Sequence, residues 1–377
     1  MTARCSAFLA GMFGILAVSS TPVTAQEINI PVLVPVTGIL SLEGTSQRNG
    51  ALLALKNLPS GVTLKSQVID TGSSAAGAAR AFQKAMSAGP TTAVAASIFG
   101  PEMLAMMPLA LENKVPLITI SGTAKITEMG NPYVFRFFPG DNVVKVAHAR
   151  YAVEVLGKKK AAIVYQTTAY GQSGHRHLVA NLKRLGAKVV FEEGIGFKVK
   201  DMLPVLRKVK QSGADVLLLH LHSGPTARVV KQAAAMGLGL PIVAGSAMHQ
   251  PSTAALLEPK ELANVCAESG SSPVSGGNPA IDKWLADYRK AFGAEPDAFA
   301  LAQYDGLMMV LGAVAKGARS AEDVRKALAT TVYKGLAMTY KSDGKGSMAH
   351  SAVIMCYDGK SRVPRIVKRY RNVTGVL

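Results

Sequence analysis

Short apolar runs alternate with amphipathic stretches along the chain from residue 28 onward. Ile28 to Pro35 is typical of a buried strand, and a loop with Gly38 and Gly44 precedes a helix through Arg48 to Leu58. Three further strands are predicted at 64–69, 92–97 and 116–120, with helices at 75–88 and 101–113 between them. Pro101 suits the first turn of its helix, where a missing N–H costs nothing. This repeated strand–helix order predicts a parallel sheet covered on both faces.

The same order is repeated after Asn131-Pro132. Helices are predicted at 142–156, 171–185, 202–211 and 226–236, and strands at 160–165, 188–192, 215–221 and 241–244. Gly270 to Pro279 is rich in Gly, Ser and Pro and is a predicted crossing between lobes. Apolar residues at helical spacing follow it, and the nearly all-apolar stretch 299–315 is expected to be buried. The pattern predicts an α/β protein of two lobes.

The first 25 residues are typical of a cleaved signal peptide. Arg4 precedes an apolar run from Ala7 to Val18, and Val23-Thr24-Ala25 supplies the small residues of a cleavage site before Gln26. The alternative is a membrane anchor, but about 12 apolar residues are too few to span the roughly 30 Å of hydrocarbon. Cys5 lies before the apolar run, which argues against a lipoprotein. We therefore expect export to the periplasm and a mature chain of about 350 residues, enough for two lobes.

Composition and charge exclude several classes of protein. Charged residues make up 18% and hydrophobic residues 49% of the chain, which is a globular composition. The formal net charge is +18, but Lys and Arg are spread along the chain without an aromatic-interleaved basic stripe. We expect no nucleic-acid partner, and we interpret the charge as solvated surface that favours encounters with anions.

Two of the three cysteines, Cys266 and Cys356, belong to the predicted mature chain. Each lies in a β-like run, and an oxidising compartment permits a disulfide between them. Two cysteines 90 residues apart do not specify a bridge, so two separate buried thiols remain the alternative.

Five segments in register resemble the Leu/Ile/Val-type periplasmic binding proteins, which are type I solute receptors of ABC importers. The segments are 30–51 (IPVLVPVTGILSLEGTSQRNGA), 115–118 (VPLI), 131–136 (NPYVFR), 169–172 (AYGQ) and 233–238 (AAAMGL). The resemblance implies two Rossmann-like lobes with parallel sheets, joined by hinge strands, and a ligand trapped between them when they close. It implies a first lobe of 26–140 plus about 271–335, and a second of about 141–270 plus 336–377. It also implies a monomer without cofactor that delivers its ligand to a membrane permease.

The resemblance places candidate ligand-binding residues in the loops at the cleft. Ser121-Gly122-Thr123 resembles the family's small-residue and threonine clamp for a carboxylate, and Tyr170 matches its closing tyrosine. Phe99 and Gly100 stand where serines are usual, and His222 stands where an aromatic residue is frequent. The family's acidic partner for an ammonium has no clear counterpart, because the loop ending in Met248 occupies its position. Glu43 lies in the first loop, near a common aromatic contact.

Elementary chemistry supports an anion clamp at the same loops. Gly100 and the Ser121 to Thr123 turn follow predicted parallel strands and lie at or near helix starts, where free N–H groups and the helix dipole favour a carboxylate. The alternative is that these are ordinary turn and capping residues. Without a clear ammonium partner we predict a small carboxylate with an apolar or aromatic body, with a branched-chain amino acid as the family default. Glu43 is the exception, since it could meet an ammonium from the other side.

The remaining candidate chemistry is weak. His220, His222, His175 and His177 supply no recognisable set of metal ligands, so we expect no metal. Asp305 lies in a very apolar helix, where we expect a structural partner or a place in the cleft. No dinucleotide fingerprint, phosphate loop or nucleophile elbow occurs, so we expect no enzyme. A sensory binding module of the same fold, reporting to a membrane receptor, is the alternative to transport.

Overall fold

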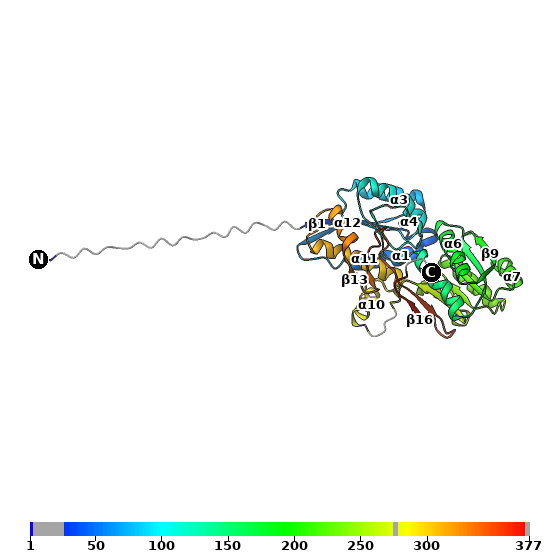
Figure 1. Ribbon diagram of the computed structural model, residues 1–377. Helices are drawn as coiled ribbons and strands as arrows, with labels where there is room; N and C mark the ends of the chain where they lie inside the picture. The colour runs from blue at the N-terminus through cyan, green and yellow to red at the C-terminus, as the bar shows by residue number, and fades with distance from the viewer. Residues whose placement is uncertain (3–25, 274–277, 374–377) are drawn as a thin grey trace.

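Two mostly parallel sheets, one in each lobe, organise the computed structural model of the chain, which describes residues 1–2, 26–273 and 278–373 (Figure 1). The predicted signal peptide therefore lies, apart from its first two residues, outside the described residues. The two-lobed α/β architecture confirms the predicted fold class.

The sheet of the first lobe has five parallel strands in the order β4-β2-β5-β6-β7. These are β2 (Val32–Val34), β4 (Val68–Asp70), β5 (Val94–Ala96), β6 (Leu117–Thr119) and β7 (Val134–Arg136). The single strand predicted for 28–35 is wrong, because β1 (Gln26–Asn29) pairs separately with β3 (Val62–Lys65). Pro31, which has no N–H to donate, stands where the chain changes from one pairing to the other.

Helices on both faces of this sheet come from two distant parts of the chain (Figure 1). The helix α1 starts at Ser41, so the loop predicted through Gly44 is wrong. Gly44 allows this helix to approach the preceding strand, because a Cβ there would lie 1.9 Å from the carbonyl oxygen of Pro35. The helical and short hairpin elements are η1 (Gly38–Leu40), α1 (Ser41–Ala54), α2 (Ala75–Ser87), α3 (Gly100–Asn113), α4 (Lys125–Glu128), α10 (Pro279–Phe292), α11 (Ala298–Ala315), α12 (Ala321–Thr330), β13 (Tyr333–Lys334) and β14 (Thr339–Tyr340).

The length and composition of α11 would allow it to cross a membrane, but 78% of it is buried inside the protein. It is therefore a core helix, as its all-round apolar pattern predicted.

The second lobe has a seven-stranded sheet in the order β16-β15-β12-β11-β10-β8-β9. Its first five strands along the chain are parallel, and the last two are antiparallel additions at one edge. The strands are β8 (Lys160–Gln166), β9 (Lys188–Ile195), β10 (Val216–His220), β11 (Ile242–Ala244), β12 (Val265–Ser269), β15 (Ala352–Cys356) and β16 (Arg365–Tyr370). The helices are α5 (Asp141–Arg150), the π-helical turn η2 (Tyr151–Val155), α6 (Ala169–Arg184), α7 (Leu203–Gln211), α8 (Ser223–Ala235), η3 (Ser246–His249), α9 (Pro251–Ala254) and η4 (Pro259–Leu262).

The fully buried Arg136, at the end of β7, ties this strand to the segment that contains Ser347. Its guanidinium donates to the carbonyl of Thr123 (3.1 Å) and to the hydroxyls of Thr127 (2.9 Å) and Ser347 (2.6 Å). Tyr340 and Met348 pack in the core of the first lobe. The lobe boundaries by residue number remain a prediction, and we propose that the last crossing lies near residue 350 rather than 335.

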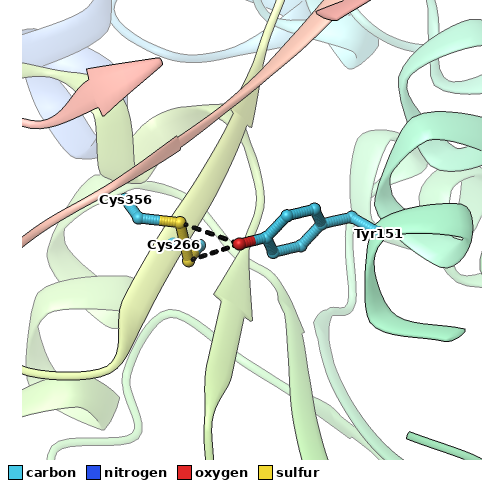
Figure 2. The surroundings of a disulfide bond; sticks show 3 residues. All are labelled: Tyr151, Cys266 and Cys356. Atoms are coloured by element: carbon cyan, nitrogen blue, oxygen red, sulfur yellow. Dashed lines mark hydrogen bonds between the residues drawn. A yellow bond between two sulfur atoms is a disulfide. The ribbon is translucent and has the colours of Figure 1, made fainter. Parts of the chain in front are cut away.

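Cys266 and Cys356 lie directly opposite each other on β12 and β15 and form a disulfide bond (Figure 2). The hydroxyl of Tyr151, on the turn η2, lies 3.7 Å from the sulfur of Cys266 and 3.2 Å from that of Cys356. The bridge that the sequence left open therefore fastens the antiparallel edge to the parallel strands.

Candidate functional site

A narrow, largely apolar cavity lies between the lobes; about 440 Å³ there is free of protein atoms, including space open to solvent. Its apolar lining comes from both lobes and from the first crossing: Leu40, Ile98, Ile120, Phe138, Val144 and Phe299. Four of the predicted ligand-binding residues also line it: Glu43, Gly122, Tyr170 and His222. They come from α1, the loop after β6, the start of α6 and the residue before α8. These positions are carboxyl ends of parallel strands or nearby helix starts, where open α/β sheets bind ligands.

The hydroxyls of Ser121 and Thr123 are buried and have no hydrogen-bond partner among the residues described. The predicted N–H donors are partly wrong, because the N–H of Ser121 donates to the hydroxyl of Thr119 (3.1 Å). The N–H of Phe99 likewise donates to the hydroxyl of Ser97 (2.9 Å). The free hydroxyls of Ser121 and Thr123, rather than these N–H groups, are therefore the candidate anion donors. They lie next to the cavity, and Gly122 is the residue of this turn that lines it.

Gly100 lies against the threonine of this turn. A Cβ at Gly100 would be 2.2 Å from Oγ1 of Thr123, so only glycine fits beside the threonine without displacing it. The first residue of α3 thereby supports the clamp without itself lining the cavity.

Phe99 and Met248 do not line the cavity. The ring of Phe99 packs edge-on against His222 at 5.8 Å between centroids, so it supports a residue that does. Met248 is fully buried in the core of the second lobe, and its carbonyl accepts a hydrogen bond from the hydroxyl of Tyr357 (2.7 Å). Ser246 and Ala247, which precede Met248 in the same loop, do line the cavity.

Glu43 lies in the first turn of α1 and reaches across to the second lobe. Its Oε1 accepts hydrogen bonds from the N–H (2.9 Å) and the hydroxyl (2.6 Å) of Ser223, at the start of α8. Its Oε2 has no partner among the described residues, and the side chain is only 2% exposed. Burial raises the pKa of this carboxyl above its ordinary value.

Asp141 is the cavity residue that sequence reasoning missed. It is the first residue of α5 and fully buried, and neither carboxyl oxygen makes a hydrogen bond of regular geometry within the described chain. Its neighbours are the hydroxyl of Ser173, whose hydrogen bonding opposes the rise that burial causes in the pKa of Asp141, and Nε2 of His220 at 3.5 Å. Its N–H donates to the carbonyl of Gly122 (2.7 Å), which places it beside the Ser121 to Thr123 turn. Burial raises its pKa to about 7. An acidic residue after Pro139-Gly140 is typical of a helix start, so nothing else in the local sequence marks Asp141 as a cavity residue.

The aromatic side of the cavity carries no charge. The ring of Tyr170 lies 3.9 Å from that of His220 and 5.0 Å from that of His222, centroid to centroid. Burial lowers the pKa of His222 to about 3, so its imidazole is neutral at physiological pH. Nε2 of His220 lies 3.5 Å from Oδ1 of Asp141, and burial lowers the pKa of His220 as well. Tyr170 and His222, which line the cavity, therefore offer neutral rings to a ligand.

Beneath the cavity, Lys145 pairs with Glu268, which also lies 3.0 Å from Nδ1 of His148. Burial alone would raise the pKa of Glu268, but Lys145 and His148 hold it at about 2. The ammonium group of Lys145 is already paired with Glu268, so we do not assign it to a ligand carboxylate. Within the described residues, no group of three or more His, Cys, Asp or Glu could hold a metal ion.

Asp305 has structural hydrogen-bond partners, as one of the two alternatives from the sequence predicted, rather than a place in the cleft. It accepts hydrogen bonds from the N–H groups of Leu336 (2.9 Å) and Ala337 (2.8 Å) and from the hydroxyl of Tyr340 (3.1 Å). These donors lie in the first lobe, and Asp305 does not line the cavity.

Comparison with known proteins agrees with this architecture. Residues 27–361 match the family described as periplasmic binding protein. An amino acid binding protein from Pseudomonas aeruginosa is 27% identical over 199 residues, which are 51% of each chain. The match thus spans about half the length of this curated relative.

Solved structures cover nearly the whole chain. A leucine binding protein from Thermotoga maritima superposes with a TM-score of 0.82 at 22% identity, over 91% of this chain and 99% of the other. A solute binding protein from R. palustris in complex with benzoate gives a TM-score of 0.83 at 17% identity, over 92% and 97%. At these identities the likeness shows the shared fold.

Proposed function

Because this chain belongs to the periplasmic binding protein family, we propose that it captures a small amino acid between its lobes for an ABC importer. The family and the solved relatives named above are solute-binding proteins rather than enzymes. The observation that carries the proposed ligand is the buried carboxyl group of Asp141, which lines the cavity. It lies next to the turn that holds Ser121 and Thr123, whose hydroxyls have no hydrogen-bond partner among the described residues.

The head of an α-amino acid matches this set of polar groups. Its carboxylate would accept hydrogen bonds from Ser121 and Thr123, and its ammonium would pair with Asp141. An ion pair with the ligand ammonium would stabilise the ionised form of Asp141, because a buried carboxylate is costly unless it is paired. From the sequence we predicted the groups that bind the ligand carboxylate but found no clear partner for its ammonium. We propose Asp141 for that role.

The remaining cavity surface suits an apolar ligand body. Leu40, Ile98, Ile120 and Val144 face it without charge. The amino acid binding protein of P. aeruginosa and the leucine binding protein of T. maritima support an amino acid in this site. A branched-chain type amino acid is the starting expectation.

An aromatic carboxylate is the second candidate. Phe138, Phe299, Tyr170 and His222 present rings to the cavity, and the R. palustris structure contains benzoate. Such a ligand would leave Asp141 unpaired, so the amino acid is favoured.

Hinge closure is the proposed mechanism. The hydrogen bonds from Ser223 to Glu43 and from the N–H of Ala124 to the hydroxyl of Ser173 (3.0 Å) join the lobes around the cavity. A ligand would bind to the first lobe in an open form, and closure would add contacts from Tyr170 and His222. We propose that the mature protein is a periplasmic monomer whose closed form is recognised by the permease. Signalling to a membrane receptor is the alternative role.

Calorimetric titration of the purified mature protein tests the ligand head. Leucine is compared with 4-methylpentanoate, which lacks the amine, with 3-methylbutylamine, which lacks the carboxylate, and with 4-hydroxybenzoate. We expect binding of leucine at least 100-fold tighter than that of either truncated analogue, since each leaves buried polar groups unpaired. Tighter binding of 4-hydroxybenzoate than of leucine would establish the second candidate instead. Small-angle scattering with the bound ligand should show compaction, and its absence would refute hinge closure.

A further inference from the structure

The cavity contains a second buried carboxyl group that the head of an amino acid does not use. Asp141 is tied through its N–H to Gly122, beside the hydroxyls of Ser121 and Thr123. Glu43 is tied instead to Ser223, at the start of α8 and next to His222. The two carboxyl groups are therefore held by different elements, and one ammonium bound beside the Ser121 to Thr123 turn leaves Glu43 unsatisfied.

Only one oxygen of Glu43 is free to contact a ligand. Oε1 is fixed by two donors of Ser223, whereas Oε2 is buried and unpartnered among the residues described. Because Glu43 lines the cavity, a ligand with a hydrocarbon side chain would leave this buried oxygen without a hydrogen bond in the closed form. Leaving a buried acceptor unsatisfied opposes binding, whereas a donor in the ligand removes that cost.

We propose that Glu43 determines specificity: the ligand is a small α-amino acid whose side chain carries a hydrogen-bond donor that Oε2 of Glu43 accepts. The donor is a hydroxyl, an amide or an ammonium group. This inference rests on the proposed function and narrows its ligand class away from purely hydrocarbon side chains. Acidic side chains are excluded as well, because they would add a fourth carboxyl group to Asp141, Glu43 and the ligand's own α-carboxylate.

Isosteric ligands test this role directly. Calorimetry on the full mature chain compares valine with threonine, and leucine with asparagine and aspartate, since each set has nearly the same shape. We expect threonine and asparagine to bind at least 10-fold more tightly than valine and leucine, and aspartate to bind most weakly. A site built to hydrogen-bond a ligand group discriminates against the analogue that lacks it.

Three variants separate specificity from closure. Glu43→Met removes the acceptor while keeping an unbranched side chain, and it should abolish or reverse the preference for threonine over valine. Glu43→Gln keeps an acceptor oxygen and should retain a preference for threonine. Ser223→Ala weakens the contact between the lobes but leaves Oε2 of Glu43 in place. It should therefore lower the affinities for threonine and valine equally and keep the ratio of the two affinities.

The outcomes distinguish this inference from the proposed function. Equal affinities for valine and threonine, aspartate bound as tightly as asparagine, or an unchanged ratio in Glu43→Met would overturn the specificity role while leaving amino acid capture intact. If none of the five amino acids bound to folded protein, as judged by a cooperative thermal transition, the proposed function would fail and this inference with it.

Discussion

Glu43 of α1 accepts two hydrogen bonds from Ser223 of α8, at 2.9 Å from the N–H and 2.6 Å from the hydroxyl, and so joins the lobes inside the cleft. Both residues are buried. The N–H of Ser223 lies at a helix start, where the helix dipole favours a carboxylate. Since the two residues belong to different lobes, opening of the cleft must break this contact.

Replacing Ser223 by alanine should therefore weaken ligand binding by destabilising the closed form. Loss of one hydroxyl hydrogen bond to a carboxylate corresponds to about 1–2 kcal/mol, or roughly a 5–30-fold rise in Kd. The change should lie mainly in the dissociation rate, which stopped-flow fluorescence or surface plasmon resonance measures. Ser87→Ala, at the exposed end of α2, is the control and should bind normally. An unchanged dissociation rate in Ser223→Ala would show that this contact does not hold the lobes together.

Gly100→Ala should damage the hydroxyl clamp without touching the cavity directly. The added Cβ would lie 2.2 Å from Oγ1 of Thr123, so the threonine must move, and we expect at least a 10-fold loss of affinity by calorimetry. Gly224→Ala is the matched control, because a Cβ at this position in α8 has no other atom within 4 Å. It should bind normally and be as stable as the parent or slightly more so. Equal binding by both variants would exclude Thr123 from the clamp.

The repeated strand–helix order was enough to predict the two α/β lobes, because buried parallel strands produce continuous apolar runs. Element boundaries were harder to predict. Pro31 lies inside an apolar run that looks continuous, yet the backbone changes strand partners there. The position of Tyr340 and Met348 in the first lobe depends on long-range packing, and no local pattern reports it.

The part of the site that lies in loops after strands was predictable. The part that lies where the chain passes from one lobe to the other was harder to predict. The turn at Ser121 to Thr123 was expected from its position after a predicted strand, whereas Tyr170 and His222 were expected only from the resemblance to the family. Asp141 begins a helix immediately after the first crossing, and its sequence context fits an ordinary helix start. Its unpaired state becomes visible only when the second lobe folds over the first.

The bridge between Cys266 and Cys356 should stabilise the second lobe. It joins residues 90 positions apart, and a disulfide typically contributes about 2–4 kcal/mol of stabilisation. Reduction, or replacement of both cysteines by alanine, should lower the melting temperature by roughly 5–15 °C in differential scanning calorimetry. Tyr151→Phe keeps the bridge and removes only the hydroxyl beside it, so it should shift the transition much less. Identical transitions with and without reductant would refute a stabilising bridge.

Asp141→Asn should stabilise the ligand-free protein at neutral and higher pH while weakening amino acid binding. Burial raises the pKa of Asp141 from 3.8 to about 7, so the folded state binds the proton more tightly than the unfolded state. The contribution of Asp141 to stability therefore falls as pH rises from about 4 to 7 and is constant above that range. Asparagine does not ionise, so the variant does not lose this stability. Its free energy of unfolding should exceed that of the wild type by near zero at pH 4 and by at most about 4 kcal/mol above pH 7.

Urea unfolding of ligand-free wild type and variant between pH 4 and 8 measures this difference, and leucine affinity should fall at least 100-fold in the same variant. Asp358→Asn is a control in which stability should change with pH in the opposite direction. Hydrogen bonds from backbone N–H groups, chiefly that of Lys360, lower the pKa of this exposed carboxyl group. Removing it should reduce stability slightly as pH rises, since its favourable contacts need the ionised form. If the difference between wild type and Asp141→Asn did not change with pH, then Asp141 would not be an unpaired buried acid. If leucine binding survived the substitution, Asp141 would not be the partner of the ligand ammonium.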